Sequence, residues 1–366
     1  MSQESLAPFS CTYSVDFPDI LLGLGSSLAI STYQSGKVIL MSPAAERIVQ
    51  LPRTFHDAMG LAVADGRLAV ATKHEVVVLA NAAELAAGFP RKPGVYDSLF
   101  VPRASYYTGP MAIHDMAWGR DGRLWAVNTV CSCLAVIEDR YNFTPMWKPP
   151  FISRLLPFDH CHLNGLALED GRPRYVTALG TTDTAQGWRQ NKLRGGVLIE
   201  VESGEVLLEG LSMPHSPRVV SGRLFLLNSA ACELLEVDPV RRTSEVVARL
   251  PGFARGLAVA GDYLFVGLSQ LRHDHKVFGD LPIASAQGLY CGVLCLHLPT
   301  GRIAGELRYL RTCKEIYDVQ VLAGVLRPGI LAPGDDTVKL ALAVPGLATW
   351  AEERPEEAAP RGSAER

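Results

Sequence analysis

The sequence predicts an all-β fold, a six-bladed β-propeller whose first blade is completed by a strand from near the C-terminus. Three observations predict it. Short apolar stretches joined by Gly-containing turns recur about every 40 to 55 residues, and six such units can be counted. The N-terminal unit lacks its first strand. The long amphipathic segments of a parallel α/β fold are missing, and the one short helix candidate is NAAELAAG at 81–88.

The repeat unit is clearest in MGLAVADGRLAVATKHEVVVLA, which begins at Met59. Related units begin at Met116, Asn164, Pro217 and Arg255. Their DG, SG and GD pairs favour the tight turns that join antiparallel strands. The flanking segments are four to seven residues long and rich in Val, Leu, Ala and Phe, which suits buried strands better than helices.

The two ends of the chain are expected to meet in one blade. SSLAISTYQSGKVIL, from Ser26, begins a unit without a first strand, and KEIYDVQVLAG at 314–324 resembles the missing one. Pairing the two removes the last open sheet edge. We therefore expect a single propeller domain over residues 10–326. Residues 327–366 form a C-terminal extension, and its Pro-, Ala- and charge-rich end is expected to be disordered after about residue 345.

Composition excludes some function classes. The net charge of -3 is spread along the chain, so no basic surface for nucleic acid or an anionic membrane is expected. The N-terminus has no signal-peptide pattern, and no apolar run approaches the length of a membrane helix. Eight cysteines without secretory features indicate reduced thiols and a cytoplasmic protein. The oligomeric state stays open.

A histidine stands just before the first strand of four successive blades. These residues are His56, His114, His162 and His215. Because the first strands of a propeller line its central channel, the four imidazoles are expected to form a ring at the channel mouth. Such a cluster suits a divalent transition metal, Fe, Cu or Zn, and an open coordination position is typical of a catalytic site. A metal-free ligand pocket and a structural role remain alternatives.

His162 belongs to the segment PFDHCHLNGLAL, which holds two histidines, a cysteine and an acid in a row. His160 is the reserve candidate for the ring, because residues two apart on a strand share a face. Cys161 is expected to point away, into the packing between blades.

Further site residues are expected on the same face. Four insertions, at 86–110, 139–161, 180–196 and 269–292, are interpreted as loops on the histidine side, whereas the turns on the opposite side are minimal. Long loops on a rigid scaffold are where binding residues concentrate. Glu315 and Arg255 are candidate catalytic residues. The candidate substrate-binding residues are Asn164, Asp318, Trp188, Arg189, Tyr107 and His273.

The segments HDAMGLA, HDMAW, HLNGLA, PHSPR and CKEIYDV resemble those of a bacterial family of conserved hypothetical propeller proteins. The resemblance covers roughly residues 10–324 and implies the six-bladed fold, but no function. The layout is also similar to that of gluconolactonase-like propellers, which hold a divalent cation with Glu and Asn or Asp. Carotenoid oxygenases hold iron with four histidines on seven blades. This chain departs from the gluconolactonase-like propellers because its ring is mainly histidine. It departs from the carotenoid oxygenases because it has six blades.

These features together predict a metal-dependent enzyme that acts on a small organic or peptide substrate. The reaction is either metal-assisted hydrolysis or elimination, or an oxygenation, and the sequence does not decide between them. No Walker A, dinucleotide-binding, HExxH or GxSxG motif is present. The alternative is a non-catalytic propeller that binds a small molecule, a peptide or a protein on the same loop-rich face.

Overall fold

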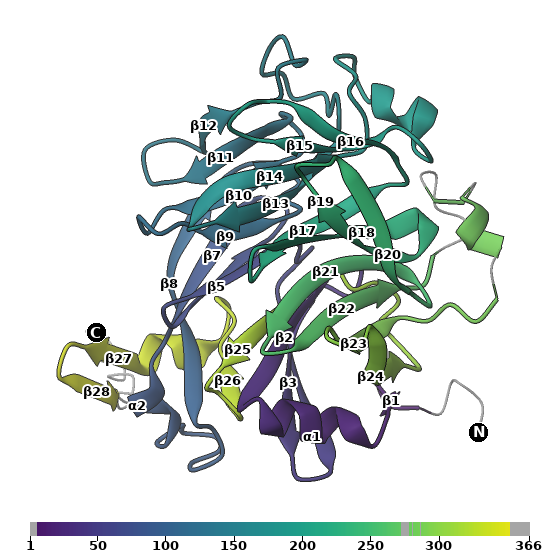
Figure 1. Cartoon of the computed structure of the whole chain (residues 1–366). Helices are drawn as coiled ribbons and strands as arrows, with labels where there is room; N and C mark the ends of the chain where they lie inside the picture. Colours follow the sequence, from purple (N-terminus) through teal and green to yellow (C-terminus); the bar gives the residue numbers. More distant parts are fainter. Residues whose placement is uncertain (1–5, 272–277, 280, 286, 352–366) are drawn as a thin grey trace, which may run out of the picture.

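The protein is a six-bladed β-propeller, as the sequence predicts. The computed structural model describes residues 6–271, 278–279, 281–285 and 287–351. Within this part of the chain, six sheets of four or five strands follow one another around a central axis, with one separate two-stranded sheet (Figure 1). The innermost strand of each sheet lines the central channel.

Three blades are built from the N-terminal half of the chain. Blade 1 contains β25 (Asp318–Ala323), β2 (Ser26–Thr32), β3 (Lys37–Ala44) and β4 (Arg47–Thr54). Blade 2 contains β5 (Leu61–Ala64), β6 (Arg67–Ala71), β7 (Glu75–Asn81) and β8 (Ser98–Tyr107), with β26 (Pro328–Ile330) parallel to β8 at its edge. Blade 3 contains β9 (Met116–Trp118), β10 (Leu124–Asn128), β11 (Cys133–Ile137) and β12 (Thr144–Trp147).

The other three blades continue around the ring. Blade 4 contains β13 (Leu163–Glu169), β14 (Arg172–Ala178), β15 (Gly196–Glu200) and β16 (Val206–Leu211). Blade 5 contains β17 (Pro214–Val220), β18 (Arg223–Asn228), β19 (Glu233–Asp238) and β20 (Thr243–Arg249). Blade 6 contains β21 (Phe253–Ala260), β22 (Tyr263–Ser269), β23 (Gly292–His297) and β24 (Arg302–Tyr309), with β1 (Cys11–Tyr13) at its outer edge.

In the described part of the chain, the helical segments are short and lie in the connections between strands. They are α1 (Asp16–Gly23), α2 (Ala83–Ala86), and the 3-10 turns η2 (Gly187–Asn191), η3 (Ser229–Ala231), η4 (Pro282–Ser285) and η5 (Asp336–Leu340). The helix candidate at 81–88 is confirmed as α2. The helix α1 was not predicted, and its Phe17 and Leu21 are fully buried against blades 6 and 1.

The hydrophobic core is divided among the seams between blades. Each of six buried clusters joins residues of two neighbouring sheets. Leu40 of blade 1, for example, shares a cluster with Leu68 of blade 2, and Phe225 of blade 5 shares one with Val266 of blade 6. Because one blade buries too little apolar surface by itself, its stability depends on its two neighbours.

The ring closes where the two ends of the chain meet in blade 1. The inner strand β25 pairs antiparallel with β2, from Ser31 opposite Asp318 to Ser26 opposite Ala323. Figure 1 shows β25, late in the chain, beside β2 from its start. The predicted closing strand is therefore confirmed.

Side-chain hydroxyl groups repeat at the seams between blades. At or just after the end of the second strand, Thr129 donates a hydrogen bond to Leu163 O at 2.6 Å and Ser229 to Ala254 O at 2.7 Å. Ser31 donates to Met59 O, and Ser269 donates to Ile316 O at 3.0 Å. In each case the acceptor lies at the start of the next blade's inner strand, or just before it. We call these contacts the seam hydrogen bonds.

Deeper in the channel, buried charges tie the inner strands together. Arg218 pairs with Asp115 through two hydrogen bonds of 2.8 and 3.1 Å. Asp115 also accepts from Leu166 N at 3.1 Å, and Asp318 accepts from Leu61 N at 2.8 Å. Each carboxylate therefore fixes the inner strand of the blade that follows it.

Two predicted loops are partly wrong. The insertions at 86–110 and 139–161 contain the outer strands β8 and β12, so that part of each lies within a blade rather than between blades. Residues 82–97 and 138–143 then join third to fourth strands, at the end of the blade opposite the histidines. The reason is that outer strands are half exposed and tolerate Pro102 and Pro145, so their apolar pattern is weak.

The chain beyond the ring packs on blade 2. The hairpin of β27 (Ala341–Val344) and β28 (Leu347–Trp350) lies beside α2 (Figure 1), where the Trp350 Nε1 donates to Leu85 O at 3.0 Å. Residues 347–350 belong to the segment that was expected to be disordered, but they form the strand β28. Residues 352–366 lie outside the described part.

The channel carboxylate Asp318 gives the fold a measurable pH dependence. Burial raises the pKa of Asp318 to about 7, and the nearby Asp115 adds to the rise. Between about pH 4 and pH 7 the unfolded chain releases this proton while the native state keeps it, so stability falls as pH rises through that window. We expect Asp318→Asn to remove this loss of stability, which is at most about 1.4 kcal/mol per pH unit in the wild type.

Urea unfolding of the wild type and the variant at pH 5 and pH 7 measures the two slopes. Asp65→Asn, at an exposed turn position, is the control and should keep the wild-type slope. Parallel slopes for Asp318→Asn and the wild type would contradict the prediction.

Candidate functional site

Three of the four predicted histidines meet at the channel mouth. The ring centroids of His114 and His162 are 4.8 Å apart, and those of His114 and His215 are 6.3 Å apart. They come from the starts of blades 3, 4 and 5. The predicted convergence is therefore correct for these three rings, although His162 precedes Leu163, which accepts the seam hydrogen bond in blade 4, and Asn164 follows it. We call them the histidine cluster.

The surrounding backbone fixes which nitrogen of His114 carries the proton. Its Nδ1 lies 2.8 Å from Ala112 O and 2.9 Å from Thr129 Oγ1. The Thr129 hydroxyl already donates its own proton to Leu163 O. Both neighbours of Nδ1 are therefore acceptors, so Nδ1 must be the donor, and the neutral ring keeps its lone pair on Nε2.

His215 repeats this arrangement two blades further on. Its Nδ1 lies 2.9 Å from both Met213 O and Ser229 Oγ, and the Ser229 hydroxyl donates to Ala254 O. Ala112 and Met213, two residues before the respective histidines, both have a positive φ near 50°. This uncommon backbone conformation turns the carbonyl group toward the imidazole.

His162 is oriented by a carboxylate. Its Nδ1 lies 2.9 and 3.0 Å from the two oxygens of Asp159, which also accepts from the Trp188 Nε1 at 3.0 Å. The ring of Trp188 is buried and 4.4 Å from that of His162. The insertion at 180–196, which contains Trp188, therefore does reach the histidine cluster, as predicted.

Two rings of the cluster, those of His114 and His215, are neutral at ordinary pH because their pKa values are lowered. Burial lowers the pKa of His114 well below 6.5, and His162 and Arg255 lower it further. Burial also lowers the pKa of His215 well below 6.5, and the charge of Arg255 lowers it further. Within the described residues, His215 Nε2 is buried without a hydrogen-bond partner. Buried polar atoms are rarely left unpaired, so this lone pair is available to accept a hydrogen bond or to bind a ligand.

A second polar group adjoins the cluster. Arg255 forms an ion pair with Glu315 at 3.0 Å, and both are largely buried. The guanidinium carbon of Arg255 is 5.0 Å from the ring centroid of Tyr317, and that ring is 5.2 Å from His114. The two candidate catalytic residues are thus paired with each other beside the histidines. Tyr317 joins them, and the sequence analysis did not single it out.

His56 is not part of the cluster, which corrects one prediction. The seam hydrogen bonds show that Met59, Leu163, Ala254 and Ile316 occupy equivalent positions. The residue after Met59 is Gly60, so a glycine takes the inward position in blade 2. His56 lies four residues earlier, is exposed, and lines a separate pocket with Glu75 and Asp335.

The other predicted residues are spread over several places. Asn164 is buried, and its Oδ1 accepts from Thr177 at 2.7 Å. Asp318 lies deeper in the channel. Arg189 is exposed, with its guanidinium carbon 5.3 Å from the Trp188 ring centroid. His160 pairs with Asp183 at 2.9 Å, and Cys161 is buried between blades 3 and 4. His273 lies outside the described residues.

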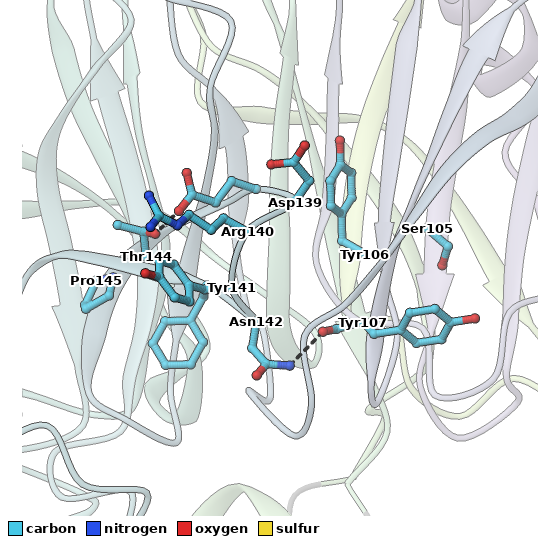
Figure 2. Close-up of a pocket in the computed structure, with 11 residues that line it drawn as sticks. Ser105, Tyr106, Tyr107, Asp139, Arg140, Tyr141, Asn142, Thr144 and Pro145 are labelled. Atoms are coloured by element: carbon cyan, nitrogen blue, oxygen red, sulfur yellow. Dashed lines mark hydrogen bonds between the residues drawn. The ribbon is translucent and has the colours of Figure 1, made fainter.

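Tyr107 lies in a pocket away from the histidines. This hollow has a volume of about 850 Å³, and Tyr106, Tyr107, Arg140 and Tyr141 are among the residues that line it. Figure 2 shows these side chains around it, with Asn142 donating a hydrogen bond of 2.8 Å to Tyr107 O. None of the clustered histidines lines it, so size and titratable chemistry point to different places. We give more weight to the histidine cluster because burial lowers the pKa of two of its rings and His215 Nε2 is buried without a partner in the described part of the chain.

As they stand, the described side chains do not form a ready-made metal site. No group of three or more His, Cys, Asp or Glu residues in this part of the chain could hold an ion without movement.

In the same part of the chain, no helix is long and apolar enough to cross a membrane.

Comparison with protein families identifies the chain. Residues 15–331 match the family described as Domain of unknown function (DUF4915). The chain belongs to the DUF4915 family. None of the curated proteins matches this DUF4915 chain significantly.

Among solved structures, a chain of a nidogen/laminin complex is similar to this one, with a TM-score of 0.52 and 11% identity over 82% of this chain and 99% of that chain. At that identity, the likeness shows the fold alone. A protein of unknown function from Bacteroides caccae has a TM-score of 0.49 and 9% identity, over 81% of this chain and 98% of that one. Virginiamycin B lyase from Staphylococcus aureus has a TM-score of 0.39 and 12% identity, over 64% and 71%.

The hydrogen bonds of the cluster predict the protonation of two histidines. In protein treated with a chelator, we expect His114 and His215 at pH 6 to be neutral with Nδ1 protonated, because burial disfavours the charged ring and Nδ1 faces only acceptors. Two-bond ¹H–¹⁵N spectra measure this. Resonances missing from His114→Asn and His215→Asn give the assignment. An imidazolium, or a proton on Nε2, would contradict the prediction.

Proposed function

We propose that this protein binds a divalent transition metal, Fe, Cu or Zn, through the Nε2 atoms of His114, His162 and His215. The observation that carries the proposal is that all three Nδ1 atoms are held by protein acceptors, two by carbonyl and hydroxyl oxygens and one by a carboxylate. Metal-ligating histidines almost always have their second nitrogen fixed in this way.

The spacing of the rings supports the same conclusion. In a tetrahedral site with metal–nitrogen bonds of about 2 Å, neighbouring imidazole centroids are about 5 Å apart. The 4.8 Å between His114 and His162 fits this value, whereas the 6.3 Å between His114 and His215 is about 1 Å too long. His215 would have to move toward the other two rings to close the site around the ion.

Three protein ligands leave a coordination position open, which is the arrangement of catalytic sites. There the metal would polarise a substrate group, or activate water or O₂. Arg255 and Glu315, beside the cluster, would contact the substrate. We therefore propose a metal-dependent enzyme acting on a small organic or peptide substrate. All eight cysteines are free thiols, which supports a cytoplasmic location as part of this proposal.

A metal-free binding site is the second candidate. One observation favours it, namely that the described side chains do not already stand at ligating positions around a common point. In that case the unpaired His215 Nε2 would accept a hydrogen bond from an organic ligand, and the protein would capture a small molecule or peptide without chemistry.

Metal binding can be measured on tag-free protein treated with a chelator and titrated with Co(II) and Zn(II). We expect about one equivalent to bind, with a Co(II) visible spectrum. His162→Asn and His215→Asn should each weaken binding at least about 100-fold because each removes one of three ligands. Asp159→Asn should weaken it about 10- to 100-fold, since the orienting carboxylate is lost.

His56→Asn and His297→Asn are the matched controls, because both histidines lie outside the cluster, and both should bind metal like the wild type. If none of Co(II), Zn(II), Cu(II) and Fe(II) binds at micromolar concentration, or if the cluster variants bind as the controls do, the metal proposal is wrong.

A further inference from the structure

Arg255 has hydrogen-bonding capacity that the fold does not use. Its Nη1 is paired with Glu315, but its Nε is buried and has no partner in the described part of the chain. The side chain is 8% exposed. The Nε–Nη2 edge of a guanidinium is a planar pair of donors, and its usual partner is a carboxylate or phosphate bound through two oxygens.

The position of this edge connects it to the histidine cluster. The guanidinium carbon of Arg255 lies 5.0 Å from the Tyr317 ring and 5.2 Å from the Phe253 ring. Those rings in turn lie 5.2 Å from His114 and 5.8 Å from His215. Arg255 is therefore one aromatic ring away from two of the three histidines, so one small molecule could contact both.

We infer that Arg255 binds the carboxylate of the substrate, so that the site takes a small organic monocarboxylate. This inference deepens the proposed function and rests on it for the reacting end of the molecule. Arg255 holds the carboxylate, and the histidine cluster faces the part of the substrate that lies beyond it.

Two features favour a carboxylate over a phosphate. The cavity that Arg255 lines with Glu315, Phe253 and Phe278 has a volume of about 20 Å³, which holds about one water-sized group. A planar carboxylate is the smaller of the two groups, so it needs less enlargement of this cavity than a tetrahedral phosphate does. Glu315 also places a negative charge next to Arg255, and it would repel a dianion more strongly than a monoanion.

The formal charges around the site agree with this class of ligand. Among the described residues, with the histidines counted as neutral metal ligands, a divalent metal and Arg255 contribute three formal positive charges, and Asp159 and Glu315 contribute two negative ones. The remainder is a single positive charge, which one carboxylate neutralises. The aromatic rings of Phe253, Phe278 and Tyr317 surround the guanidinium. They would contact the apolar part of a ligand whose carboxylate is bound by Arg255.

Isothermal titration of the full chain, with and without one equivalent of Zn(II), tests the inference. The probes are acetate, benzoate, inorganic phosphate, trialanine and the C-terminal amide of trialanine. We expect acetate or benzoate to bind and phosphate to bind at least about tenfold more weakly. Trialanine binding in preference to its amide would identify the C-terminus of a peptide as the source of the carboxylate.

Variants assign the binding to Arg255. Arg255→Gln should weaken carboxylate binding roughly tenfold or more, and Arg255→Lys should rescue it only in part, because lysine lacks the planar pair of donors. Glu315→Gln should tighten binding, since a competing negative charge is removed. Arg223→Gln is the control, because Arg223 is exposed and paired with Glu236 on the outside of blade 5.

The outcomes separate this inference from the metal proposal. Carboxylate binding that depends on Arg255 but persists without metal, in a protein that binds no metal, supports the inference and overturns the metal proposal. The inference is overturned if no carboxylate probe binds the wild type, if phosphate binds as tightly as acetate and benzoate, or if Arg255→Gln binds them as tightly as the wild type. Arg255→Gln should still bind about one equivalent of Zn(II), because Arg255 is not one of the three proposed ligands.

Discussion

Pairing of β25 with β2 is the interaction on which the rest of the structure depends. Each blade buries its apolar surface only against its neighbours, so a ring with one unfinished blade leaves two seams exposed. The six residues of β25 complete blade 1 and place Val319 in the cluster between blades 6 and 1. The same strand positions Tyr317 and Asp318, so closure of the ring also completes the channel and one side of the site.

The seam hydrogen bonds link the fold to the chemistry of the histidines. Thr129 and Ser229 each donate to the next blade and accept from an imidazole. Because the hydroxyl proton is committed to the neighbouring carbonyl, the imidazole must donate from Nδ1. Contacts that hold two blades together thereby leave Nε2 as a free lone pair. Burial and Arg255 act in the same direction, since both disfavour the charged ring.

The sequence was sufficient to predict the ring and its closure, because tight turns and buried strands repeat in it. It was less informative about the outer strands, since β8 and β12 are half exposed and contain proline. The predicted position of His56 was wrong because the prediction equated the pair His56–Asp57 with the pair His114–Asp115. The physical anchor is instead the carbonyl group that accepts a seam hydrogen bond, which is Met59 O in blade 2. Counting from hydroxyl groups at strand ends would have assigned Gly60 to the inward position.

The partners of the histidines could not have been predicted from repeats, because they break the repeat. Asp159 ends a long connection and Trp188 lies in an insertion, yet both meet His162. Tyr317, His114, His162, His215 and Arg255 come from five of the six blades. The site therefore exists only when the ring is complete. A ligand that contacts several of these residues binds the closed ring and not the open chain, so its binding free energy adds directly to the stability of closure.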